Sequence, residues 1–302
     1  MTKTVLILGA SGKIGSHSAE AFWNAGWTVR KFDRATGDMR NAAEGADVIV
    51  NGMNPANYKN WNTAIPQITR DVIDAAKHSG ASVIIPGNIY NFGDQPGTLS
   101  ETTPHLATTR KGKIRIEMEE AYRASSVQTI VLRAGNFIDP MQNGDILSLV
   151  LFRSIKSGKV TLPGPADTQQ AYAYVPDWAR AAVILAEKRD ALATFEDIPF
   201  PGHAFTYEEL RQKTADALGR KVTFTAFPWW LMTLAAPVWG LAYEMKEMRY
   251  QYAMDHTLDG VKFTRLLPEF KPTDRDTVMT TGLRPQVDPH QTVRAGGEAV
   301  GA

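Results

Sequence analysis

Three glycines near the N-terminus have the spacing of a loop that could hold a phosphate. The turn follows an uncharged run, 4–8, that is typical of a strand buried on both faces. A helical pattern begins at once after it, so the turn leads into a helix N-terminus. Such a turn lets the backbone approach a pyrophosphate, to which the first helical N–H groups can donate. The residues that we expect to contact a dinucleotide here are Gly9, Ser11, Gly12, Lys13, Ile14 and Gly15.

An acidic residue closes the next strand pattern, 27–32. Asp33 lies 24 residues after Gly9, near the spacing of a carboxylate that binds an adenosine ribose. It would accept hydrogen bonds from both ribose hydroxyls of NAD and would repel the 2′-phosphate of NADP. Arg34 and Lys13 could bind that phosphate if Asp33 turned away. Both cofactors therefore stay open, and the carboxylate favours NAD.

The spacing GxxGxxG, rather than GxGxxG, resembles the extended branch of the short-chain dehydrogenase/reductases, the NAD-dependent epimerase/dehydratase family. Gly37-Asp38-Met39 resembles the adenine-contacting segment that follows the family's third strand. The run 46–52, which ends in Asn51 and Gly52, resembles the fourth strand and its turn under the cofactor. Only four residues separate Asp33 from Asp38, so we expect the family's second helix to be missing.

The resemblance also implies a catalytic Ser or Thr, and a Tyr-x-x-x-Lys on the following long helix. In the family the Lys holds the nicotinamide ribose and the Tyr exchanges a proton with the substrate. If Lys113 is that lysine, the tyrosine position is Thr109 and the Ser/Thr position is Asn88. Lys111 is an alternative to Lys113, and a third alternative is that the family lysine has no counterpart at either position. Because threonine is too weak an acid, we expect Tyr90 to supply the proton, its pKa lowered by Lys113, unless it only packs under the loop.

The substrate side of the site is less defined. Asn136 follows Leu132-Arg133 as the family's substrate-contacting asparagine does. The nucleotide-sugar enzymes commonly carry a diphosphate-binding arginine two residues before the position of Tyr172, and here that residue is Gln170. Its loss argues against a nucleotide-diphosphate substrate. The aromatic residues of this part suggest an apolar or aromatic small molecule, unless the tryptophans are plain core: Tyr172, Trp229, Trp230 and Trp239.

Composition narrows the class of protein further. The formal net charge is +1, so we expect no nucleic acid as a partner. The chain has no cysteine, which excludes disulfides, thiol nucleophiles and cysteine-ligated metals. The six histidines are scattered without ligand spacing, and we expect no metal. Because the first strand pattern starts at Thr4, we expect no signal peptide and a cytoplasmic location.

Alternating strand and helix patterns predict an α/β fold, a Rossmann-type doubly wound parallel sheet with a smaller C-terminal substrate domain. We expect the dinucleotide-binding domain over 1–138, with returns to the sheet near 171–200. The substrate domain would take 139–170 and 201–283, and 284–302 would be a loose tail. The uncharged stretch 222–243 is interrupted by Pro228 and Pro237, so we expect no membrane span. Helices over 60–79 and 104–124 are expected to pair in a homodimer, as in the family.

Two functions are compatible with these patterns. The first is an NAD(P)-dependent oxidoreductase or epimerase of the extended short-chain type, acting on a small non-nucleotide carbonyl or alcohol. The second is a non-catalytic NAD(P)-binding redox sensor, because relatives without the tyrosine serve in that role. More than a hundred residues follow the sixth strand pattern, 129–132, and a pure sensor would not need them to bind a cofactor. The enzyme is therefore favoured.

Overall fold

A parallel sheet of six strands forms the centre of the computed structural model, which describes residues 2–35, 37–55, 58–142 and 144–283. Its strands stand in the order β10-β6-β4-β3-β1-β2. They are rich in Val, Ile and Leu, and the inner ones are almost wholly buried because helices cover both faces. The expected doubly wound α/β fold is confirmed. The strand bounds are β1 Thr4–Leu8, β2 Thr28–Lys31, β3 Val48–Asn51, β4 Ser82–Gly87, β6 Thr129–Arg133 and β10 Phe195–Pro199.

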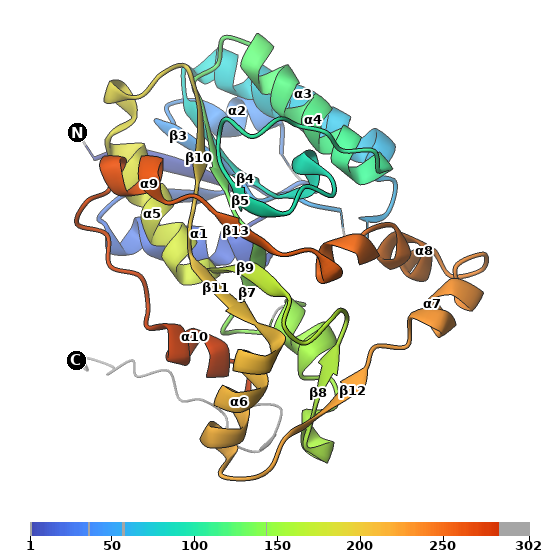
Figure 1. Cartoon of the computed structure of the whole chain (residues 1–302). Coiled ribbons are helices and arrows are strands. Elements are labelled where there is room, and N and C mark those ends of the chain that lie inside the picture. The colour runs from blue at the N-terminus through green and yellow to red at the C-terminus, as the bar shows by residue number, and fades with distance from the viewer. Residues whose placement is uncertain (1, 36, 56–57, 143, 284–302) are drawn as a thin grey trace.

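Two helix pairs make the outer layers (Figure 1). On one face α1 (Lys13–Asn24) and α5 (Val175–Glu187) pack together, with Phe22 and Trp178 in one core cluster. On the other face α3 (Trp61–Ser79) packs against α4 (Arg110–Ala124), where Trp61 and Tyr122 share a second cluster. The helix expected over 104–124 thus begins six residues later, at Arg110.

The connection between β2 and β3 is shorter than the resemblance implies. The residues described between them contain only the five-residue helix α2 (Met39–Ala43) and no strand. The expectation that Gly37-Asp38-Met39 follows a third strand is therefore wrong. The seven residues 32–38 leave no room for a further helix and strand before α2, so β3 is the third strand of the chain.

The smaller lobe is built mainly from the C-terminal part of the chain and has its own core (Figure 1). Its strands form three small sheets. These are β7 (Asn136–Ile138), β9 (Gln169–Tyr174) and β11 (His203–Thr206); β8 (Lys159–Leu162) and β12 (Thr223–Ala226); and β5 (Gly97–Leu99) and β13 (His256–Leu258). Its helices are α6 (Tyr207–Leu218), α7 (Trp229–Ala235), α8 (Gly240–Glu247) and α10 (Arg275–Thr280), whereas α9 (Val261–Leu266) packs beside α5 and β10 on the large sheet.

The uncharged stretch 222–243 contains a strand, β12, and then two short helices, α7 and α8. None of the described helices combines the length and the apolar character that a membrane span requires. The tail expected over 284–302 lies outside the described residues.

Candidate functional site

The glycine turn joins β1 to α1 and lies against the end of β3. Gly9 adopts a left-handed φ of 72°, and a Cβ on it would lie 2.9 Å from the Gly52 carbonyl carbon. A Cβ on Gly15 would lie 2.2 Å from the Gly9 carbonyl oxygen, so both glycines allow close packing. Among the described residues, a Cβ on Gly12 would meet only the Gly9 carbonyl oxygen, at 3.4 Å, and no side chain caps α1. The first N–H groups of α1 are therefore available to a pyrophosphate, and the turn fits NAD.

The other residues of the turn differ in their contacts. Lys13 Nζ donates to the Gly144 carbonyl oxygen, 2.8 Å away, in the loop that follows β7. Burial lowers the pKa of the Lys13 ammonium, despite two aspartates nearby. Ile14 is buried in the core under the sheet, and Ser11 is exposed. Lys13 thus ties the turn to the smaller lobe, while Ser11 is left to contact a ligand.

The residues expected at the adenosine end lie at the surface beyond β2. Asp33 and Arg34 are exposed, and Asp33 Oδ1 accepts the backbone N–H two residues further on, at 2.9 Å. Asp38 caps α2, because its Oδ1 accepts the N–H two residues further on, at 2.8 Å. Met39, the first residue of α2, is half-buried. Asp33 and Arg34 thus remain accessible to a ribose, whereas Asp38 serves the helix.

Asn51 holds the loop that faces the glycine turn. Its Oδ1 accepts the Met53 N–H at 3.1 Å, and its Nδ2 donates to the Tyr122 hydroxyl at 3.3 Å. Burial raises the pKa of Tyr122, so this phenol stays protonated. Asn51 therefore supports the loop that follows β3, and the adjacent Gly52 packs closely against the glycine turn.

Helix α4 presents different residues to the site from those that the Tyr-x-x-x-Lys spacing predicts. Thr109 is the N-cap, and its Oγ1 accepts the Gly112 N–H at 3.2 Å. Lys113 is exposed, whereas Lys111 is fully buried and Arg115 half-buried. Positions four apart share a helix face, and positions two apart lie on opposite sides. Lys111 and Arg115 therefore lie on the inward side of α4, whereas Lys113 is exposed and Thr109 caps the helix.

The inward lysine is fully engaged in ion pairs. Lys111 Nζ lies 2.6 Å from Glu244 Oε2 and 3.2 Å from Glu247 Oε2, both on α8, and 4.4 Å from the Tyr58 ring centroid. Arg110 pairs with Glu244 as well. These contacts fasten α8, a helix of the smaller lobe, to α4, a helix of the nucleotide-binding half.

Tyr90 follows β4 and points its hydroxyl to that of Tyr58, 3.5 Å away. Burial raises the pKa of Tyr90 well above its usual range, and the neighbouring Tyr58 phenol adds to this, while Arg115 opposes it. The expected lowering of this pKa by Lys113 is therefore wrong, because desolvation dominates and the positive charge that opposes it is that of Arg115. Asn88 Oδ1 accepts the Tyr90 N–H at 3.0 Å, so Asn88 shapes the turn that carries the phenol.

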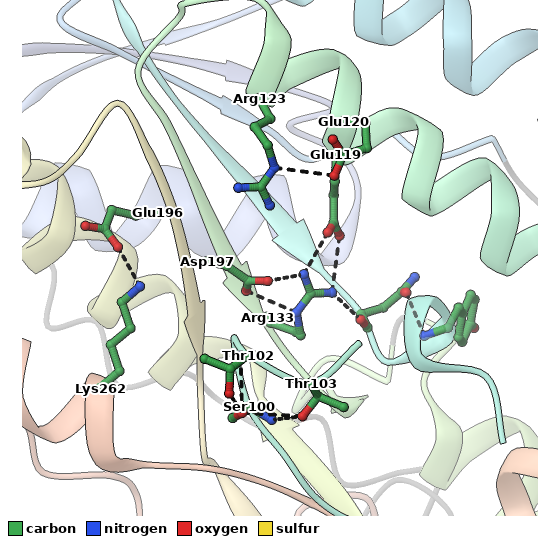
Figure 2. Close-up of polar contacts among 12 residues, drawn as sticks. Ser100, Thr102, Thr103, Glu119, Glu120, Arg123, Arg133, Glu196, Asp197 and Lys262 are labelled. Atoms are coloured by element: carbon green, nitrogen blue, oxygen red, sulfur yellow. Dashed lines mark hydrogen bonds and ion pairs between the residues drawn. The ribbon is translucent and has the colours of Figure 1, made fainter. Parts of the chain in front are cut away.

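A buried charge network under this turn escapes sequence inspection. The guanidinium of Arg133, at the end of β6, lies between the carboxylates of Glu119 on α4 and Asp197 on β10 (Figure 2). Its Nη1 also donates to the Asn88 carbonyl oxygen at 2.6 Å. Although burial opposes its charge, the two carboxylates raise the pKa of Arg133. His105, Glu119 and Asp197 place three possible metal ligands within 4.8 Å of one another, but both carboxylates bind Arg133.

The expected substrate residues are mostly structural. Gln170 is buried, and its Nε2 donates to the Gln251 and Met254 carbonyl oxygens at 3.0 and 2.8 Å. Tyr172 is buried and stacks on Phe205 with ring centroids 4.0 Å apart. Gln170 and Tyr172 are therefore held by hydrogen bonds and packing within the smaller lobe. The half-buried Asn136 stays near it, with its Nδ2 3.5 Å from Gln170 Oε1.

The tryptophans do not gather around one pocket. Trp229 is buried in the core of the smaller lobe, and its Nε1 donates to the Pro163 carbonyl oxygen at 2.8 Å. Trp230 and Trp239 are exposed. The interpretation of Trp229 as plain core is thus the one that the packing supports.

Comparison with known proteins agrees with this arrangement. Residues 5–198 match the model of the NAD dependent epimerase/dehydratase family. None of the curated proteins compared matches the chain significantly.

Three solved structures illustrate the shared fold. MoeE5 in complex with UDP-glucose and NAD is 18% identical, with a TM-score of 0.72 over 92% of this chain and 96% of that one. UDP-glucuronic acid 4-epimerase from Bacillus cereus, in complex with NAD, is 15% identical, with a TM-score of 0.74 over 96% and 100%. Bordetella bronchiseptica WbmH in complex with NAD+ is 17% identical, with a TM-score of 0.69 over 93% and 97%.

Proposed function

Because the chain belongs to the NAD-dependent epimerase/dehydratase family, we propose that it is an NAD-dependent enzyme acting at a carbonyl or carbinol carbon of a small, non-nucleotide substrate. NAD, bound at the glycine turn, would supply the hydride transfer. The exposed carboxylate of Asp33 at the end of β2 supports NAD over NADP. The remaining chemistry falls to side chains at the carboxyl ends of β3 and β4.

The observation that carries this proposal is the position of Tyr90. It follows the carboxyl end of β4, on the same edge of the parallel sheet as the glycine turn after β1, and its hydroxyl lies 3.5 Å from the Tyr58 hydroxyl. Because burial raises its pKa, the phenol is protonated near neutral pH. It can therefore donate a proton to a substrate carbonyl oxygen as hydride reaches the carbon. Asn88 would hold Tyr90 in place.

Gln170 supports a substrate without a nucleotide diphosphate. Its side-chain amide donates hydrogen bonds to two backbone carbonyl oxygens. A neutral, buried amide cannot form the charged, bidentate contact that an arginine makes with a diphosphate. The solved neighbours with UDP-sugars share only the fold with this chain, so their ligands do not decide its substrate.

One observation favours the second candidate, a non-catalytic NAD(P)-binding sensor. Thr109 caps a helix and Lys113 faces solvent, so the family's proton-transfer pair has no direct counterpart at its expected place. In a sensor, NAD would still bind at the glycine turn, but Tyr90 would have no effect on any reaction.

A comparison of two variants separates these functions. The enzyme is screened with reduced cofactor against short aldehydes, keto acids and sugars, and turnover is followed by nicotinamide absorbance. Tyr90→Phe should reduce turnover by about 10²–10⁴-fold, the usual contribution of a general acid, and leave NAD affinity unchanged. Thr109→Val should retain most of the activity. An inactive Thr109→Val beside an active Tyr90→Phe would contradict this assignment, and no turnover with any substrate would favour the sensor.

We also propose a homodimer through α3 and α4. Of the apolar side chains on α4, Ile114 and Met118 are already buried within the chain, so Ile116 and Ala121 would make the contact. Light scattering at micromolar concentration tests this, and a monomer would contradict it.

A further inference from the structure

Arg115 is the cation on the inner face of α4 that lacks a strong partner. Its Nη1 lies 3.5 Å from Met118 Sδ, a weak acceptor, and its Nη2 lies 3.4 Å from Asn54 Oδ1, at the limit of a hydrogen bond. Its Nε is buried without a hydrogen-bond partner, and its guanidinium lies 4.8 Å from the Trp61 ring centroid. Of the ion pairs among the described residues, within 4.0 Å, none includes Arg115.

The neighbouring buried cations are treated differently. Lys111 has two carboxylates from α8, and Arg133 has one from α4 and one from β10. A charge removed from water without a partner is unfavourable, so folded proteins neutralise such groups or use them to bind a ligand. Burial lowers the pKa of Arg115, which agrees with this missing partner.

The position of Arg115 indicates where a ligand would lie. Asn54 comes two residues after Gly52, which contacts the glycine turn. The positive charge of Arg115 also acts on the Tyr90 phenol. The guanidinium is therefore near both the loop that follows β3 and the side chain proposed to move the proton.

We propose that Arg115 binds an anionic oxygen group, a carboxylate or a phosphate, of the ligand that occupies this site. The inference rests on the proposed function for the ligand's identity, but the anion binding itself does not require turnover. A guanidinium offers a planar fork that matches such a group with two parallel hydrogen bonds. Trp61, against which the guanidinium lies, would hold its plane in place.

The anion could come from two sources. A substrate carboxylate would lie beside the carbon that exchanges hydride, whose oxygen Tyr90 is proposed to protonate. The substrate would then be a hydroxy acid or a keto acid. The diphosphate of the cofactor is the other source, although the free N–H groups behind Gly12 already offer it a site. The test must therefore measure both ligands.

The experiment compares thermal unfolding of the wild-type chain with that of Arg115→Met, which keeps the length of the side chain and removes its charge. Without ligand, Arg115→Met should unfold at the same or a higher temperature, because it relieves an unpaired buried charge. Lactate and inorganic phosphate should raise the unfolding temperature of the wild type and do so much less in the variant. Arg123→Met, an exposed arginine on the same helix that pairs with Glu120, is the matched control.

Titration calorimetry then assigns the source. If a substrate carboxylate is bound, Arg115→Met should weaken lactate binding by about 10- to 100-fold, as expected for charge-assisted hydrogen bonds, with NAD affinity unchanged. If the loss falls on NAD, Arg115 holds the cofactor diphosphate. Arg115→Lys should keep only part of either affinity.

The proposal is overturned if Arg115→Met unfolds at a clearly lower temperature without ligand and its responses to lactate, phosphate and NAD equal those of the wild type. Arg115 would then be a packing residue. Tyr90→Phe should retain the anion response in full. A chain without any turnover that still shows an Arg115-dependent anion response would contradict the proposed function and leave the anion site intact.

Discussion

The two halves of the sheet edge carry the candidate site in different ways. On the side of β1, β2 and β3, the backbone forms the site: glycines allow close packing and the N-terminus of α1 offers its N–H groups. On the side of β4 and β6, side chains form it, and buried charges hold them. Tyr90 depends on Asn88, whose carbonyl oxygen depends on Arg133, which in turn depends on Glu119 and Asp197.

This difference has a consequence for robustness. A backbone site tolerates most changes elsewhere, because its geometry depends on a few glycines. A site held by a buried charge network loses its geometry when any one partner is removed, since the remaining charges are left without a counter-charge. The two halves should therefore respond to substitution in different measurements, binding on one side and stability on the other.

The largest expected effect is on the charge network. Arg133→Met removes the cation and leaves the carboxylates of Glu119 and Asp197 buried without it, which should lower the free energy of unfolding by about 3–5 kcal/mol. Urea denaturation followed by circular dichroism measures this. The control, Arg123→Met, removes an exposed pair on α4 and should cost less than about 1 kcal/mol. Equal, small losses in both variants would refute the dependence on buried charge.

The next effect is on the glycine turn. Gly12→Val places a side chain where there is open space in front of α1, so the fold should survive and NAD affinity should fall by more than about 100-fold. Isothermal titration with NAD measures the affinity. Gly240→Val, at the start of α8 and also without a close neighbour, should bind NAD as the wild type does. Unchanged affinity in Gly12→Val would rule out the turn as the cofactor site.

The same contrast explains what sequence inspection could find. The glycine turn and the core strands were predictable because their signals are local: residue type, spacing and hydrophobic period within a few residues. The side of β4 and β6 was not, because the spacing that aligned Lys113 with the family lysine says nothing about which face of α4 turns inward. The Arg133 network joins β6, α4 and β10, and no local pattern connects these segments. Lys111 and Arg115 are both charged and lie four positions apart, so they share one face of α4. That spacing was the signal that could have identified the inward face.

The smallest expected effect concerns the contact between α1 and the smaller lobe. Asp139 accepts a hydrogen bond from His17, 2.9 Å long, and another from the Met141 N–H. These hydrogen bonds lower the pKa of Asp139 below its usual range, although burial acts in the opposite direction. A carboxyl whose pKa is lower in the folded chain stabilises it above the unfolded pKa, near 4. That contribution is lost as pH falls through the folded pKa. Between pH 6 and pH 3, Asp139→Asn should therefore lose less unfolding free energy than the wild type; an identical pH profile would exclude this role.

The orientation of α4 is the central claim, and amine labelling with and without NAD tests it most directly. The intact protein is acetylated with a water-soluble reagent, and each lysine is quantified by mass spectrometry. Lys113, which is exposed, should react readily and to the same extent with NAD bound, whereas the buried Lys111 should react slowly in both samples. Strong protection of Lys113 by NAD would contradict the account, and would return this lysine to the cofactor ribose.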